Sequence, residues 1–438
     1  MTRRIIVHLA AAALLAAAAI AAPVAAQTAE LAVGLGHCRG AAGTEMSISP
    51  WGLGYDAVGD ALLIAEQKIN QDVCIWSIGG AIRPFAGTGV SGYSGDGGDA
   101  TLAQLQGPID VVVDTSEAYI SEGARIRVVQ LARGAANGSG TITTAVGDSI
   151  LWGPMGLALD HDDHLFVADC NQHRVVRFNV PCFGPGTCGP AVTVAGASGA
   201  NGSSGDGGPA TAARLNCPVD VAIAADGALL IADMNNNKIR RVSPSGVITT
   251  VAGGGFTTLP DVGDGGPATS ARLQFPRGVF PSPDGGFDIS DGTQNRVRHV
   301  TPAGVISTIL GNGQLSTGVP PQPGGMNPLT LALTAPSGLQ RDKRGALFVA
   351  SDRQAAGAVV SLRNGAATPI STATATRLAA TATAPPTLTA TAPPSATWTV
   401  TRTPTSPPTA TATATRRRTC IYSSPVPTAA LNEPCDPS

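Results

Sequence analysis

Short apolar runs, separated by turns rich in glycine and aspartate, recur along the chain from about residue 50 to residue 362. Six of these runs begin with a proline that is followed, two residues later, by glycine or aspartate. They start near residues 50, 108, 154, 218, 276 and 336, so neighbouring starts are 46 to 64 residues apart. This spacing predicts six copies of one structural unit.

Each unit contains four segments with the character of β-strands. A first apolar segment leads through an Asp- or Gly-containing turn to a second one, which ends in an acidic residue in five of the six units. A third segment alternates basic and apolar residues, and a fourth follows it. Four short strands in each of six units predict an all-β fold, a six-bladed β-propeller. The expected second strands are residues 62–66, 118–122, 165–169, 229–233, 287–291 and 347–351; the clearest third strands are 174–178, 238–242 and 296–300; the clearest fourth strands are 142–147, 192–196, 248–253 and 306–311.

The last unit lacks a fourth strand, because its third segment runs directly into a different composition. Residues 31–34, ahead of the first blade, have the character of an unattached fourth strand. Pairing the two ends of the chain within one blade would remove two exposed sheet edges. We therefore predict that residues 30–36 complete blade 6.

The N-terminus has the pattern of a secretory signal. Arg3 and Arg4 precede an alanine-rich apolar run over residues 5–22, and small residues lie just before Gln27. This pattern predicts a cleaved signal peptide over residues 1–26, with an uncleaved membrane anchor as the alternative. We therefore expect a secreted or extracytoplasmic protein that has no membrane span after cleavage.

The chain is expected to contain one folded domain and one tail. Residues 27–363 would form the propeller. Residues 364–438 are rich in threonine, alanine and proline, bury too little apolar surface to fold, and are predicted to form a disordered tail with a short Cys-bounded end.

Export changes how the eight cysteines are interpreted, because an even number in an oxidising compartment favours disulfides. Two pairs would close short local loops. Two other pairs have positions in neighbouring blades on the same face of the propeller. No spacing of cysteine and histidine matches a zinc site. The expected disulfides are Cys38–Cys74, Cys170–Cys217, Cys182–Cys188 and Cys420–Cys435.

Residues 226–242, which read Asp-Gly-Ala-Leu-Leu-Ile-Ala-Asp-Met-Asn-Asn-Asn-Lys-Ile-Arg-Arg-Val, closely resemble the NHL repeat. With its Gly-Asp-Gly-Gly-Pro-Ala-Thr inserts, the arrangement is similar to secreted bacterial NHL proteins and to the NHL portion of teneurins. The resemblance covers residues 30–363 and is weakest in the first and last blades. Some NHL domains bind RNA through a basic face. A net charge of −2 on an exported chain argues against nucleic acid as the partner.

Two sets of carboxylates recur in the repeat. The acids that end the second strands would converge on one face, where a ring of carboxylates could hold a metal. Alternatively, each acid accepts hydrogen bonds from the following turn and pairs with a basic residue five positions later, at Arg174, Lys238 or Arg296. The recurring offset favours this structural role. The strand-end acids are Glu66, Glu122, Asp169, Asp233 and Asp291, and the inserts contribute Asp96, Asp206 and Asp264.

Each Gly-Asp-Gly-Gly insert supplies a single carboxylate, so a compact turn before a short helical step, fixed by a following leucine, is favoured over an ion site. The histidines do not form a converging set either, since three of them fall in blade 3. The mature chain contains His37, His161, His164, His173 and His299.

We therefore expect an exported, non-enzymatic binding or scaffold propeller without a cofactor. Its interaction face would carry the strand-end acids and the inserts, and its partner would be a protein or a cell-surface ligand. The alternative from another class is a metal-dependent lyase or lactonase with a site on the propeller axis. A third is a structural envelope component that binds no small ligand.

Overall fold

The structure is a computed structural model that describes residues 27–34, 38, 50–67, 70–78, 80–135, 138–182, 188–255, 262–315, 327–351 and 358–364. The expected signal peptide, the tail beyond residue 364, His37, and the expected Cys420–Cys435 pair lie outside these residues.

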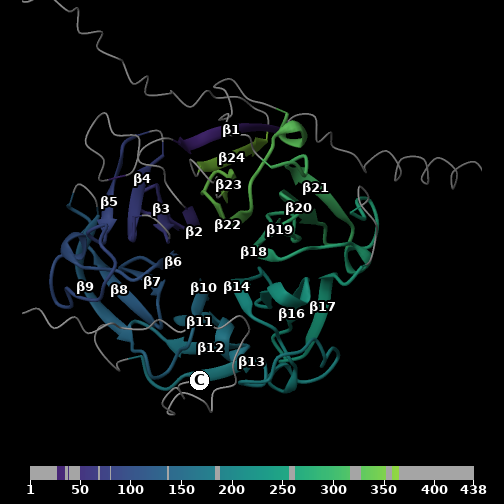
Figure 1. Cartoon of the computed structure of the whole chain (residues 1–438), viewed down its shortest axis with the longest axis horizontal. Helices are drawn as coiled ribbons and strands as arrows, with labels where there is room; N and C mark the ends of the chain where they lie inside the picture. The colour runs from purple at the N-terminus through teal and green to yellow at the C-terminus, as the bar shows by residue number, and fades with distance from the viewer. Residues whose placement is uncertain are drawn as a thin grey trace, which may run out of the picture. The chain divides into compact units, whose positions relative to one another are not determined.

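Six four-stranded antiparallel sheets surround a common centre, so the fold is a six-bladed β-propeller (Figure 1). The strands that begin with the repeated proline lie nearest the centre. Blade 1 contains β2 (Pro50–Asp56), β3 (Ala61–Glu66), β4 (Asp72–Ser77) and β5 (Ile82–Ala86); blade 2 contains β6 (Pro108–Val113), β7 (Glu117–Glu122), β8 (Arg125–Leu131) and β9 (Ser139–Val146); blade 3 contains β10 (Pro154–Leu159), β11 (His164–Asp169), β12 (Arg174–Asn179) and β13 (Val192–Ala195); blade 4 contains β14 (Pro218–Ile223), β15 (Leu229–Asp233), β16 (Lys238–Val242) and β17 (Ile248–Gly253); blade 5 contains β18 (Pro276–Pro281), β19 (Phe287–Asp291), β20 (Arg296–Val300) and β21 (Ile306–Leu310); blade 6 contains β22 (Pro336–Arg341), β23 (Leu347–Ser351), β24 (Ala358–Asn364) and β1 (Gln27–Gly34).

The register of the first two strands defines the two faces of the propeller. In blade 3, Pro154 lies opposite Asp169, whereas Leu159 lies opposite Leu165. The repeated prolines and the strand-end acids are therefore at one face, which we call the acid-end face. The turns that join the first strand to the second are at the opposite face, which we call the hairpin face.

The apolar core lies between neighbouring blades, because the two faces of each sheet are covered by the preceding and the following blade. One cluster, for example, combines Leu63 and Ala65 of blade 1 with Val111 and Ile120 of blade 2. The leucine after each Gly-Asp-Gly-Gly insert is also buried, as expected for a residue that fixes the insert between two blades. These leucines are Leu105, Leu215 and Leu273.

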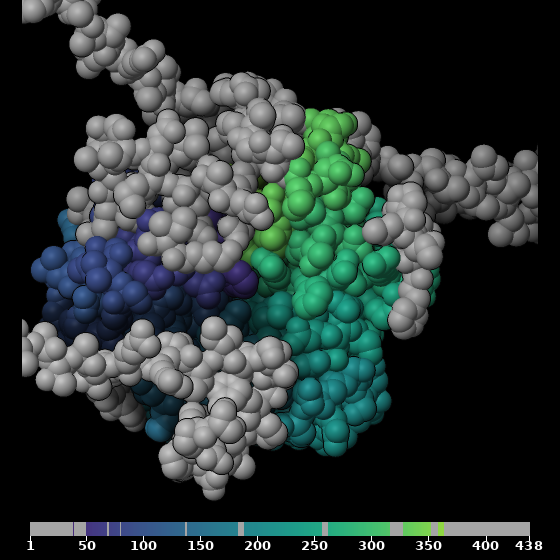
Figure 2. Space-filling view, in the orientation of Figure 1, coloured from purple at the N-terminus to yellow at the C-terminus, as the bar shows by residue number. Residues whose placement is uncertain are grey.

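The two ends of the propeller meet in blade 6. β1 pairs antiparallel with β24, from Gln27 opposite Asn364 to Gly34 opposite Ala358. The strand therefore begins three residues earlier than the sequence pattern suggested. In the space-filling view the purple first blade lies beside the green last blade (Figure 2).

Three disulfides occur among the described cysteines, and they join three of the expected pairs, two between neighbouring blades and one across a short local loop. Cys38 is bonded to Cys74, Cys170 to Cys217, and Cys182 to Cys188. The second of these links the end of blade 3's second strand to the start of blade 4.

Candidate functional site

The strand-end acids are enclosed and do not form a surface. Glu66, Glu122, Asp169, Asp233 and Asp291 are each 0% exposed. The expectation that they belong to an exposed interaction face therefore needs correction. Their carboxylates are used inside the blades, by loop amides and by basic side chains.

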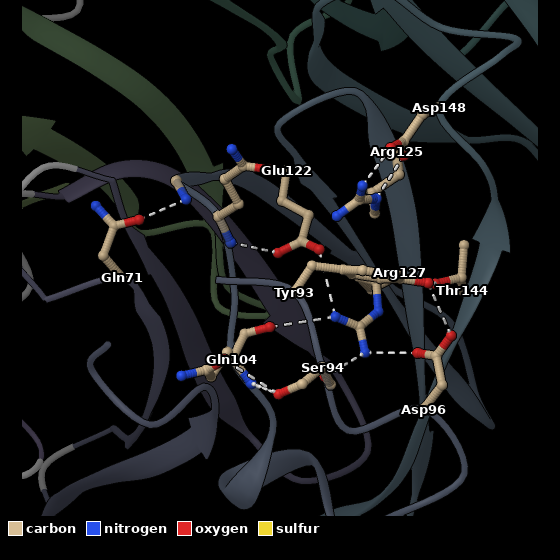
Figure 3. Close-up of polar contacts among 12 residues, drawn as sticks. Gln71, Tyr93, Ser94, Asp96, Gln104, Glu122, Arg125, Arg127, Thr144 and Asp148 are labelled. Carbon is tan, nitrogen blue, oxygen red and sulfur yellow. Dashed lines mark hydrogen bonds and ion pairs between the residues drawn. The ribbon is translucent and has the colours of Figure 1, made fainter. Parts of the chain in front are cut away.

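In blade 2 the acid belongs to a network centred on a fully buried arginine (Figure 3). Arg127 Nη2 lies 2.6 Å from Asp96 Oδ1 of the insert, and its Nη1 lies 3.3 Å from Glu122 Oε1. Tyr93 donates to Asp96 and is 2.9 Å from the Thr144 hydroxyl. One guanidinium thus joins the strand-end acid to the insert carboxylate.

Blades 4 and 5 repeat this network. Arg240 lies 2.7 Å from Asp206 and 3.4 Å from Asp233. The hydroxyl of Thr250 donates to the second oxygen of Asp206 at 2.7 Å. In blade 5 the central arginine is Arg298, which pairs with Asp264 of the insert and with the strand-end acid Asp291. The threonine that donates to Asp264 is Thr308.

In blade 4 the strand-end acid pairs with the basic residue that lies diagonally across from it on the third strand. Lys238 lies directly opposite Asp233, whereas Arg240 lies two residue pairs further along, opposite Ile231 and on the same side of the sheet. The longer, fully buried Arg240 reaches the acid, so the expected pairing with Lys238 is wrong. In blade 3 the expected pair does form, with Arg174 Nε 3.1 Å from Asp169. Blade 5 follows blade 4, because Asp291 pairs with Arg298 rather than with Arg296.

Burial shifts the pKa of these acids, but it also keeps substrates away from their carboxylates. Burial raises the pKa of Glu122 and of Asp233, although arginine and loop amides oppose the shift. It also raises the pKa of Asp291 to about 7. Because all three side chains are 0% exposed, a substrate has no direct route to them.

The inserts cover the outer edge of the blade that follows them. In the insert before blade 4, Gly207 N–H donates to Ile248 C=O, and Ile248 N–H donates to Gly208 C=O. Gly207 has φ +81°, where glycine is favoured. The insert therefore pairs with β17 and leaves less of its edge open to other chains. The same pairing occurs at Asp99 with Thr141 and at Pro267 with Val305.

Replacing Thr250 with valine is expected to lower the free energy of unfolding by about 0.5–1.5 kcal/mol, because Asp206 loses one hydrogen bond at nearly constant shape. Urea denaturation measures the change. Thr249→Val on the same strand, at an exposed position, is the control and should have little effect. Equal losses in both variants would mean that the bond to Asp206 contributes nothing.

Three of the four described histidines, His164, His173 and His299, have hydrogen-bond partners near them, and His161 lies in an exposed turn. His164 Nδ1 is 2.8 Å from Asp160, and His173 Nδ1 accepts the Cys217 N–H at 3.1 Å. His299 lies between two carboxylates, which raise its pKa against the opposing effect of burial. None of the described histidines lines the axial cavity.

Among the described residues, one group of side chains has the spacing of metal ligands, and it consists of Cys38, Asp72 and Cys74. The two cysteines are joined by a disulfide, so their sulfurs are not thiolate ligands. This group is therefore not a metal site in the oxidised protein.

A cavity of about 230 Å³ opens on the axis, between the halves of the first strands that approach the hairpin face. Asp110 and Asp220 line it, and they also line a narrower pocket towards the acid-end face. The two carboxylates thus occupy the middle of the axial channel. Every blade contributes at least one apolar residue to its walls, including Leu53, Val112, Leu157, Val221, Val279 and Leu339.

Each axial carboxylate is bonded to backbone amides of another blade. Asp110 Oδ2 accepts the Leu157 N–H of blade 3 at 2.8 Å. Asp220 Oδ2 accepts the Val279 N–H of blade 5 at 2.8 Å. Burial raises the pKa of Asp110 to about 7. The pKa of Asp220 is also raised, mainly by burial and further by the charge of Asp110.

This pair was not among the residues expected from the sequence, although the repeat contains a signal for it. Both acids occupy the position two residues after the repeated proline, where the other blades have glycine. A Cβ on Gly52 would lie 2.2 Å from Asp110 Oδ1, and one on Gly156 would lie 2.3 Å from Asp220 Oδ1. These Cβ positions would also lie 2.5 Å from Ile109 O and 2.9 Å from Val219 O, so the backbone of the next blade as well as the aspartate leaves room only for glycine.

The acid-end face carries two exposed aromatic residues close to the buried acids. Trp152 is 63% exposed and Phe275 is 41% exposed. Asp169 accepts the Trp152 N–H at 3.0 Å, and Asp291 accepts the N–H of Gln274, the neighbour of Phe275, at 2.7 Å. The strand-end acids thus fix the loops that present these aromatic side chains.

No helix among the described residues is long and apolar enough to cross a membrane.

Comparisons with known proteins agree with this architecture. The model of the teneurin NHL domain matches residues 157–260. Protein SUPPRESSOR OF QUENCHING 1, chloroplastic, of Arabidopsis thaliana is 28% identical over 214 residues, which are 44% of this chain and 19% of that protein. Teneurin-3 of Danio rerio is 29% identical over 168 residues, covering 26% of this chain and 6% of the teneurin. The match thus spans less than a fifth of either curated relative.

The fold is shared with an auxiliary nutrient binding protein from Bacteroides thetaiotaomicron VPI-5482. Its crystal structure superimposes with a TM-score of 0.53 and 14% sequence identity, over 77% of this chain and 76% of that chain.

Proposed function

The chain belongs to the NHL-repeat β-propellers, and from that premise we propose that it is an exported, non-enzymatic binding protein. Three disulfides among the described residues suit an oxidising compartment. In this proposal a signal peptide over residues 1–26 directs export. The tail over residues 364–438 acts as a spacer between the propeller and whatever lies beyond it.

The observation that carries the proposal is the presentation of Trp152 and Phe275 on the acid-end face. Large aromatic side chains are enriched in protein interfaces and often dominate their binding energy. Both loops are held by hydrogen bonds to buried carboxylates, so little order has to be gained on binding. We infer that this face binds a protein or a cell-surface ligand, with these aromatic residues as its anchors.

The competing proposal is a metal-dependent lyase or lactonase on the propeller axis. The axial position of Asp110 and Asp220 favours it, since carboxylates are hard-cation ligands. The lining of the axial cavity, as far as the structure describes it, offers no histidine and no further carboxylate. Binding is therefore the better supported function.

The test is partner capture by the full chain immobilised in its oxidised form, from an extracytoplasmic extract. Trp152→Ser together with Phe275→Ser is expected to reduce the captured partner at least tenfold, because removing one aromatic anchor typically costs about 1–2 kcal/mol or more. Both side chains are exposed, so the melting temperature should change little.

Val58→Ser is the matched control, because Val58 is 66% exposed and lies in the turn between β2 and β3 on the hairpin face. Capture should be unchanged in this variant. Equal capture by the wild type and the double variant would refute binding through the aromatic residues. Turnover of lactone or lyase substrates that is abolished by chelation would favour the enzyme instead.

A further inference from the structure

The axial cavity lies on the opposite side of the propeller from the aromatic residues, and its role does not depend on the proposed function. It narrows from the hairpin face towards Asp110 and Asp220 in the middle of the channel. Typical sites for drug-sized ligands occupy roughly 300–1,000 Å³. A cavity of about 230 Å³ therefore fits one small molecule or a single extended side chain.

The two carboxylates differ from the strand-end acids of blades 2 to 5 in having no ion pair with a basic side chain. Glu122, Asp169 and Asp233 each form an ion pair with arginine. No ion pair of Asp110 or Asp220 occurs among the described residues; Asp110 is only 9% exposed, and Asp220 is partly buried. Two neighbouring carboxylates that are shielded from water and have no ion-paired cation are unfavourable when both are ionised.

The walls restrict which cation can compensate this charge. A calcium ion requires about six to eight oxygen ligands, and a hydrated ion requires a polar surround. Here each blade contributes an aliphatic side chain to the wall, from Leu53 in blade 1 to Leu339 in blade 6. An organic cation matches both features, because its apolar part can contact the walls while its charge reaches the carboxylates.

We propose that the axial cavity binds a protonated primary amine carried on an unbranched apolar chain, with the ammonium group between Asp110 and Asp220 and the chain directed towards the hairpin face. An ammonium group offers three N–H donors, which suits two carboxylates that face one channel. Charge-assisted hydrogen bonds of this kind are stronger than neutral ones. The amine can belong to a small molecule or to a lysine side chain of a partner.

Binding of this ligand depends on pH. Because burial raises the pKa of Asp110 to about 7, the pair takes up a proton as pH falls through that value, and the ammonium group then loses a charged acceptor. The other titratable groups that line the channel are Asp220 and Tyr55, with Arg277 at the narrower end. An alkylamine remains protonated throughout this range. Affinity should therefore be at least tenfold lower at pH 5 than at pH 8.

The experiment is calorimetric titration of the full chain with n-hexylamine, Nα-acetyl-lysine methylamide and n-hexanol at pH 8. At least one of the two amines should bind with one-to-one stoichiometry, whereas hexanol should bind at least tenfold more weakly. Binding of hexylamine alone identifies a free amine as the ligand source. Binding of the lysine derivative, with or without hexylamine, extends the source to lysine side chains.

Asp110→Asn and Asp220→Asn should each weaken amine binding at least tenfold. The matched control is Asp162→Asn, in the exposed turn between β10 and β11. Melting curves show whether each variant is folded, and the pH dependence of the wild type tests the site without any substitution. The proposal is overturned if neither amine binds, if hexanol binds equally well, if the variants and the wild type bind alike, or if calcium binds the pair and the amines do not.

Discussion

Replacement of Arg240 by methionine should lower the free energy of unfolding by about 3–5 kcal/mol. The guanidinium is fully buried and bridges Asp233, also fully buried, to Asp206 of the insert. Removing one partner of a buried ion pair leaves the other charge uncompensated, which costs about this much. Methionine fills a similar volume, so little of the loss should come from a cavity. Urea denaturation at pH 7, with the midpoint and slope fitted together, measures the effect.

The neighbouring residue provides a matched control. Arg241 lies on the same strand and pairs with Asp226, but its side chain is 31% exposed and that of Asp226 is 60% exposed. Arg241→Met should therefore cost less than about 1 kcal/mol. The double variant Arg240→Met with Asp233→Asn should recover part of the loss, because the remaining acid is then neutral. If the two single variants lose equal stability, the buried network is not a stability determinant.

Asp110→Asn should stabilise the ligand-free protein at pH 8 by about 2–4 kcal/mol. Burial raises the pKa of Asp110 to about 7, compared with an ordinary value near 4 in the unfolded chain. A carboxyl whose pKa is raised by folding contributes stability that is fully present below pH 4 and is lost as pH rises through 7. Asparagine stays neutral and keeps an oxygen that can accept the Leu157 N–H.

The pH profile distinguishes this effect from ordinary changes in packing. The gain from Asp110→Asn should shrink to below about 1 kcal/mol at pH 4, where the wild-type carboxyl is itself protonated. Asp162→Asn, at an exposed turn position, should show no comparable dependence. Urea denaturation at one-unit intervals from pH 4 to pH 8 gives both curves. If Asp110→Asn lowers stability equally at pH 4 and pH 8, ionisation of Asp110 does not destabilise the folded protein.

The arrangement of strands was predictable because each blade repeats the same local signals. In blade 4 the expected strands at 229–233, 238–242 and 248–253 coincide with β15, β16 and β17. Proline marks the start of the first strand and an acid marks the end of the second. Such signals act within a few residues, so they survive even where the blades diverge in detail.

The partners of the acids were less predictable, because spacing along a strand gives the side of the sheet but not the reach of a side chain. Arg240 and Lys238 lie on the same side, and only the three-dimensional structure shows which one is enclosed. A correlation within the sequence nevertheless points to the answer. The blades preceded by a Gly-Asp-Gly-Gly insert also have arginine at the diagonal position, namely Arg127, Arg240 and Arg298.

The axial pair shows a second limit. Asp110 and Asp220 are 110 residues apart, and nothing local to either one indicates a carboxylate neighbour. Their proximity arises only when the ring closes and every first strand faces the same axis. The variation between glycine and aspartate two residues after the repeated proline was visible in the sequence. Its structural role depends on how the blades are arranged around the axis.

The pairing of β1 with β24 also has a consequence for the order of folding. Residues 27 and 364 are neighbours in one sheet, so blade 6 can be completed only after the whole intervening chain has been synthesised. Blades 1 to 5 are each built from consecutive strands and can form from local contacts, whereas the last sheet must close a loop of more than 300 residues. The ring should therefore shut last, and until then β24 presents an open edge to other chains.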